Sequence, residues 1–141
     1  MLHDDLKMTG HLAIAINNEV VQEVPNLVVT AGKGYVASRM KDTSLGAMSH
    51  MAIGTNSTAA ASGNTALGSE ADRNGLASTV VSGATVTYTA TFGACEGTGA
   101  ITEAALLNAS SAGTMLCRTV FAVVNKGSQD SMTITWSVTV S

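Results

Sequence analysis

Two stretches of the chain alternate strictly between apolar and small polar residues. From Met132 to Val140 every even position is apolar and every odd position is Thr or Ser, and Ala84 to Phe92 repeats this arrangement with four threonines on one side. A repeat of two residues is the period of a β-strand, because neighbours on one face of a helix recur at three and four. The pattern therefore predicts two long strands with apolar inner faces, which carry Trp136 and Tyr88, and with polar but uncharged outer faces.

The N-terminal third predicts a hairpin followed by a helix. His11 to Val24 alternates on both sides of Asn17-Asn18, two residues that tolerate positive φ, and Pro25 ends the second strand. A helix is expected at about 31–41 with Thr30 as its N-cap. The two glycines in its first turns each cost about 1 kcal/mol relative to alanine, so packing must hold this helix in place.

The remaining elements are shorter. Strands are expected at 48–54, 77–81 and 114–124, a single helical turn at 65–68, and a loop at 125–130, while 101–108 fits either a helix or a strand. The segment 55–68 has no apolar period and reads as a long loop, a feature that is usually functional or ordered by a partner. These elements predict a mainly β fold, an antiparallel β-sandwich or jelly-roll-like barrel with one short helix. We expect an N-terminal arm at 1–10 and a single β-rich domain at 11–141.

The composition narrows the surroundings of this domain. Charged residues make up 12% of the 141 residues, against about 25% in an ordinary domain, and the mean hydropathy is +0.27. Such a chain belongs in a membrane or in an assembly that covers its surface. No apolar stretch approaches the roughly 18 residues of a spanning helix, and two tyrosines and one tryptophan cannot form the aromatic girdles of a membrane barrel. Assembly is the better interpretation, with folding in a reducing cytoplasm because no signal peptide is evident.

Residue chemistry gives no catalytic motif. The net charge of −3 and the absence of a basic cluster argue against a nucleic-acid surface. Cys95 and Cys117 lack histidine partners at ligand spacing, so buried or free thiols are favoured over a disulfide. Glu96 and Glu103 flank a glycine-rich loop without a spacing that fixes a general acid and base. We expect no enzyme activity, cofactor, metal, membrane or small-molecule substrate.

Several segments, taken in order, resemble small structural proteins of tailed bacteriophages. They are Asn26–Met40, Met51–Thr55, Thr65–Gly68 with Glu70, Gly99–Ala104 with Leu107-Asn108, Met115–Phe121 with Lys126, and Thr133–Trp136. The resemblance covers about residues 24 to 141 and favours a strand at 101–108. Two departures are an Ala-rich loop after Gly54, and Ala105 and Leu107 where Gly and Phe are expected.

The resemblance implies a capsid decoration, head-fibre or tail-fibre protein. The leading hypothesis is a non-enzymatic decoration or cement protein that binds the head lattice, with the major capsid protein or another virion protein as partner. It would be a homo-oligomer, a trimer being favoured, that is found in the virion after assembly in the bacterial cytoplasm. The alternative is a tail-fibre or tail-tip component that binds a receptor or glycan through loops such as Gly93–Gly99.

The candidate contact residues lie in the two segments that lack a core-facing pattern. They are His3, Asp4 and Asp5 in the arm, and Asn56, Ser57, Thr58 and Asn64 in the long loop.

Overall fold

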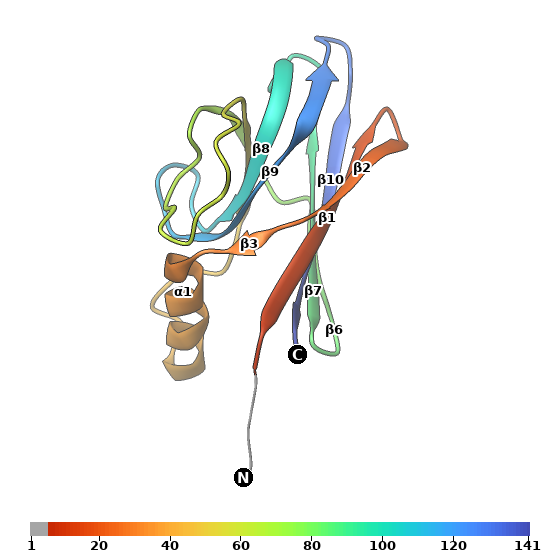
Figure 1. Cartoon of the computed structure of the whole chain (residues 1–141). Coiled ribbons are helices and arrows are strands. Elements are labelled where there is room, and N and C mark those ends of the chain that lie inside the picture. Colours follow the sequence, from red (N-terminus) through yellow and green to blue (C-terminus); the bar gives the residue numbers. More distant parts are fainter. Residues whose placement is uncertain (1–5) are drawn as a thin grey trace.

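The chain folds into two antiparallel sheets that pack face to face (Figure 1). The computed structural model describes residues 6–141. Sheet A has the strand order β2-β1-β10-β7-β6, and sheet B has the order β3-β9-β8-β4-β5. The elements are β1 (Met8–Ile16), β2 (Glu19–Pro25), β3 (Leu27–Val28), α1 (Thr30–Lys41), β4 (His50–Gly54), β5 (Glu70–Gly75), β6 (Ser78–Ser82), β7 (Thr85–Phe92), β8 (Gly99–Leu107), β9 (Met115–Lys126) and β10 (Met132–Val140). The mainly β sandwich with one short helix is confirmed.

The two alternating stretches are neighbours, as their patterns predict. Strand β10 pairs with β7 from Met132 opposite Phe92 to Thr139 opposite Thr85, and it pairs with β1 on its other side. Strand β10 therefore lies at the middle of sheet A. The predicted β1–β2 hairpin also forms, and Asn17 and Asn18 adopt φ values of 49° and 69°, as a two-residue hairpin turn requires.

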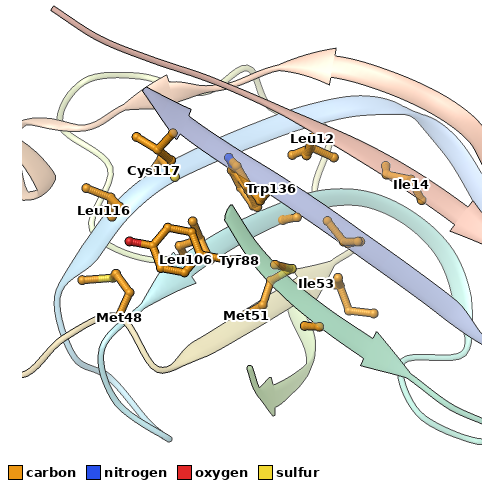
Figure 2. Packing of buried hydrophobic residues seen from close by; sticks show 14 of the residues in the cluster. Leu12, Ile14, Met48, Met51, Ile53, Tyr88, Leu106, Leu116, Cys117 and Trp136 are labelled. Atoms are coloured by element: carbon orange, nitrogen blue, oxygen red, sulfur yellow. The ribbon is translucent and has the colours of Figure 1, made fainter. Parts of the chain in front are cut away.

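The main core fills the space between the sheets. Trp136 is fully buried, and its cross-strand neighbours Leu12 and Tyr88 are buried on the same face. Figure 2 shows these side chains packed against Met51 and Leu106 of sheet B. Burying a large apolar side chain stabilises the fold by about 1.5–3 kcal/mol. The expectation that Trp136 and Tyr88 belong to the core is confirmed.

The outer face of sheet B is covered by the chain itself. Loop 55–69 crosses β8 and β9 on the side away from sheet A (Figure 1), and a second, smaller core forms beneath it. Its buried members include Leu67 from the loop, Ala105 and Leu107 from β8, and Met115 from β9. Strand β8 and the start of β9 are therefore buried on both faces, which explains why β8 is an almost continuous apolar run.

Helix α1 packs beside the start of β9. A Cβ atom at Gly32 would lie 2.1 Å from the carbonyl oxygen of Leu116, so the absence of a side chain allows this close approach. Tyr35, one turn later, is buried in the main core. Packing thus holds the glycine-containing helix, as its weak propensity requires.

The helix start differs from the prediction. Val29, not Thr30, is the N-cap, and it makes no side-chain capping bond. The Thr30 N–H donates to the Ser62 carbonyl at 2.8 Å and the Val29 N–H donates to the Leu116 carbonyl at 3.2 Å, so the loop and β9 replace a side-chain cap.

Four segments differ in their secondary structure. Residues 8–10, expected in the arm, form the start of β1 because they pair with the end of β10. Residues 65–68 form no helical turn, and Glu70–Gly75 is an edge strand whose charged sequence carries no apolar period. Strand β9 continues through Lys126, beyond the predicted loop boundary, because Lys126 pairs with Gly99.

Candidate assembly surface

The outer face of sheet A carries mostly small, uncharged side chains on β1, β10, β7 and β6, while Glu23 of the edge strand β2 lies beside them, opposite Ala13. We define the threonine face as the outward-facing residues of β1, β10, β7 and β6. It contains no Lys, Arg, Asp or Glu, and its members are Thr9, His11, Ala13, Ala15, Ser78, Val80, Ser82, Thr85, Thr87, Thr89, Thr91, Thr133, Thr135, Ser137 and Thr139. Within residues 6–141 no segment covers this face in the way that loop 55–69 covers sheet B.

Hydroxyl groups on the threonine face pair across the β7–β10 ladder. Thr85 and Thr139 share a hydrogen bond of 2.8 Å, and Thr91 and Thr133 share one of 3.1 Å. A third pair joins Thr87 and Ser137 at 3.3 Å. These bonds partly satisfy the polar groups within the sheet itself.

This chemistry lowers the cost of covering the face. Burying an unpaired charge is expensive, whereas a hydroxyl that keeps a hydrogen-bond partner costs far less. Methyl groups of the threonines and alanines also gain from removal from water. The threonine face is therefore well suited to contact with a flat protein surface.

The predicted contact loop is ordered by its own chain. The side chains of Glu103 on β8 and Arg118 on β9 lie beneath it, 0% and 2% exposed, and their ion pair measures 2.9 Å. The Glu103 carboxylate accepts hydrogen bonds from the N–H groups of Asn56, Gly68 and Ser69 at 2.8–3.0 Å. Both ends of the loop are thus bound to a single buried carboxylate.

Arg118 fixes the middle of the loop. Its Nη1 donates to the Asn64 Oδ1 at 3.0 Å and its Nη2 donates to the Thr58 carbonyl at 3.1 Å. The Asn64 Oδ1 also accepts the Ala61 N–H, and the Asn56 Oδ1 accepts the Thr58 N–H. Two of the four predicted loop contacts, Asn56 and Asn64, therefore stabilise the loop itself.

Ser57 and Thr58 remain exposed, and only these two of the four predicted loop residues project their side chains freely. The other predicted contacts, His3, Asp4 and Asp5, lie outside the described residues. The structure brings none of the loop residues onto the threonine face, because the loop covers sheet B and the threonine face belongs to sheet A.

The environment of Glu103 determines its protonation. Burial by itself would raise the pKa of this carboxyl group, but the N–H groups of Ser69 and Gly68, the Arg118 guanidinium and the N–H of Asn56 together hold the pKa below its ordinary value. Glu103 is therefore an ionised structural anchor. This network was not predicted, although one signal was available: Glu103 and Arg118 are opposite charges whose neighbours in β8 and β9 are mostly apolar.

Other reactive groups are dispersed. Glu96 binds the side-chain amide of Asn74, Cys95 is exposed, and Cys117 is buried and unpaired. Among residues 6–141 no group of three His, Cys, Asp or Glu side chains could hold a metal ion. In the same range, no helix is long and apolar enough to cross a bilayer.

Comparison of the chain with protein-family models, characterised proteins and solved structures gives no match.

Proposed function

We propose that the chain is a non-enzymatic structural protein of a tailed-bacteriophage virion, a decoration protein that binds the head lattice through its threonine face. The observation that carries this proposal is the contrast between the two sheets. Strand β8 and the start of β9 in sheet B are covered on both faces by the chain itself, whereas the outer face of sheet A is bare and carries no charge on β1, β10, β7 and β6. An isolated subunit gains no stability from an exposed face of this kind. A subunit in an assembly can bury the face without desolvating charges.

The placement of the resembling segments supports the phage assignment. Asn26–Met40 forms β3 and α1, Gly99–Asn108 contains β8, and Met115–Phe121 begins β9. With Met51–Thr55 and Thr65–Glu70 they make up most of sheet B and its cover. The resemblance therefore follows mainly sheet B and its cover, and one further segment, Thr133–Trp136, lies in β10 of sheet A.

The dispersion of reactive groups supports a non-enzymatic role. The buried carboxylate of Glu103 accepts hydrogen bonds on both oxygens and is paired with Arg118. An open hollow of about 500 Å³ between β1 and α1 is lined by apolar side chains with Lys7 and Lys33, and it contains no carboxylate or thiol. Neither arrangement supplies a general acid and base.

The decisive measurement is the position and copy number of the protein on purified particles. Electron cryo-microscopy should place it on the head with a copy number that follows the capsid lattice, and the major capsid protein should be its neighbour. A low copy number at the tail would contradict the decoration role and support the tail-fibre alternative. A trimer bound to the lattice is the oligomer that the resemblance favours.

A matched pair of variants tests the face itself. Thr135 is exposed on the threonine face, whereas Thr43 is exposed in the turn after α1. Thr135→Lys should weaken binding to capsids that lack the protein by at least about tenfold, because the new ammonium must be desolvated. Thr43→Lys should bind as the unmodified chain does. Equal binding by both variants would exclude the threonine face as the contact.

A further inference from the structure

The four edge strands of the sandwich are protected to different degrees. Edge strands expose unpaired N–H and C=O groups, and natural sheets discourage unwanted pairing there with charges, proline or very short strands. Strand β2 carries Glu19, Glu23 and Pro25, and β5 carries Glu70, Asp72 and Arg73. Strand β3 is only two residues long. These three edges are protected in the expected ways.

Strand β6 has none of these protections. Its sequence, Ser-Thr-Val-Val-Ser, contains no charge and no proline, and all five residues are exposed. Val80 and Val81 are 57% and 69% exposed. Two adjacent valines on an open strand edge are favourable for β-pairing and unfavourable for contact with water.

The two valines lie on opposite faces of sheet A. Val80 pairs with Thr87 and belongs to the threonine face, whereas Val81 pairs with Val86 on the inner face. A partner strand added to β6 would therefore meet an apolar side chain on each face. One strand of a sheet can provide both contacts, because its side chains alternate.

A second copy of the chain can supply such a strand without bringing like charges together. In a two-fold antiparallel contact centred on Val80, Val80 faces its own counterpart, Thr79 faces Val81, and Ser78 faces Ser82. A charged residue in β6 would lie opposite or next to the same charge of the second copy, and β6 contains no charged residue. We propose that two copies of the protein pair through β6, so that the two sheets A form one continuous antiparallel sheet.

The pairing extends the threonine face across the dimer. Ser78, Val80 and Ser82 lie on the same outward side as the threonines of β7, so the uncharged surface would run uninterrupted from one copy to the other. The inference concerns the isolated protein and does not depend on its place in a virion. It also specifies a two-fold contact, which a trimer alone does not contain.

A charged variant tests the contact in solution. Val80→Lys places two ammonium groups opposite each other at the axis, while Val123→Lys adds the same charge at an exposed valine of β9. In sedimentation velocity over a concentration series, the unmodified chain should dimerise, and Val80→Lys should weaken the dimer by at least about tenfold. Val123→Lys should leave it unchanged, and circular dichroism should show that both variants fold. A monomeric unmodified chain, or an oligomer that Val80→Lys does not weaken, would overturn the proposal.

A cysteine variant tests the register without adding charge. Directly opposed residues of antiparallel strands have Cα atoms about 4.5–5.5 Å apart, a separation that a disulfide can span. In a Cys95→Ser background, Val80→Cys should form a covalent dimer under mild oxidation, and Val20→Cys, placed at an exposed valine of the β2 edge, should not. Failure of Val80→Cys to cross-link, or equal cross-linking at both positions, would contradict the proposed axis.

Discussion

Arg118 and Glu103 form a buried ion pair in which one guanidinium donates twice to one carboxylate oxygen. The Nη2 and Nε atoms of Arg118 lie 2.9 and 3.3 Å from the Glu103 Oε1. The residues are diagonal neighbours, because Arg118 is opposite Ala105 in the β8–β9 register. The pair therefore links the two strands to each other and to the loop above them.

Removal of either partner should destabilise the protein strongly. Glu103→Ala or Arg118→Ala leaves an uncompensated buried charge, which costs about 3–5 kcal/mol. The double variant should lose less than the sum of the single variants, because the two residues act on one network. Denaturant unfolding of the four proteins measures this coupling, and additive losses would show that the pair does not act as a unit.

The same pair makes stability depend on pH. The pKa of Glu103 is held below its ordinary value in the folded protein, so the unfolded chain binds a proton more readily. The stabilisation is fully present above the unfolded carboxyl pKa, and it is lost as the pH falls through the folded pKa. Unfolding free energies should therefore fall in acid. Glu103→Gln should flatten this dependence, and an unchanged pH profile would assign it to other carboxyl groups.

Two glycines of α1 should respond in opposite directions to the same substitution. Gly32→Ala forces a Cβ atom against the Leu116 carbonyl oxygen and should destabilise by about 1–3 kcal/mol. A Cβ atom at Gly34 meets no atom within 4 Å, so Gly34→Ala should stabilise the helix by up to about 1 kcal/mol. Thermal unfolding measures both shifts. Equal effects of the two substitutions would mean that helix propensity alone controls both positions.

The two thiols should differ in reactivity. Cys95 is exposed, whereas Cys117 is fully buried, and burial raises the pKa of the Cys117 thiol well above its ordinary value. A thiol reagent should modify one cysteine in the folded protein and two in denaturant. Cys95→Ser should abolish the reaction of the folded protein, and rapid modification of that variant would contradict the packing around β9.

Deletion of residues 1–5 tests the contribution of the arm to binding independently of the stability of the fold. The Lys7 and Ser141 backbones exchange hydrogen bonds of 2.7 and 2.8 Å, and β1 begins at Met8, so the deletion removes none of the described pairing. Thermal stability should be unchanged, and capsid binding should weaken if His3, Asp4 and Asp5 are contacts. Unchanged binding would exclude the arm and leave the threonine face as the proposed contact.

Local pattern was sufficient to predict most of the fold. The alternation in Met132–Val140 predicted its paired faces, and Asn17-Asn18 predicted the hairpin turn, because each signal depends on adjacent residues. The charged edge strand Glu70–Gly75 was missed, since it pairs with β4 through its backbone and carries no alternating apolar face.

The network beneath loop 55–69 required tertiary information. Glu103 and Arg118 are separated by a turn and lie on neighbouring strands, and the Asn56 N–H donates to Glu103 from 47 residues away. No local sequence period predicts that these three residues lie together. The loop was expected to be functional or ordered by a partner, and the structure shows that two charged side chains of the same chain order it.

The cover of sheet B has a consequence for the sequence of events in assembly. Because the loop is bound to an ion pair inside the subunit, it cannot be exchanged with a neighbour without exposing that pair. The bare face of sheet A requires no such rearrangement. If the chain assembles as proposed, each subunit would therefore complete its folding alone and dock as a rigid body, and its rate of incorporation would be governed by encounter and orientation and not by refolding.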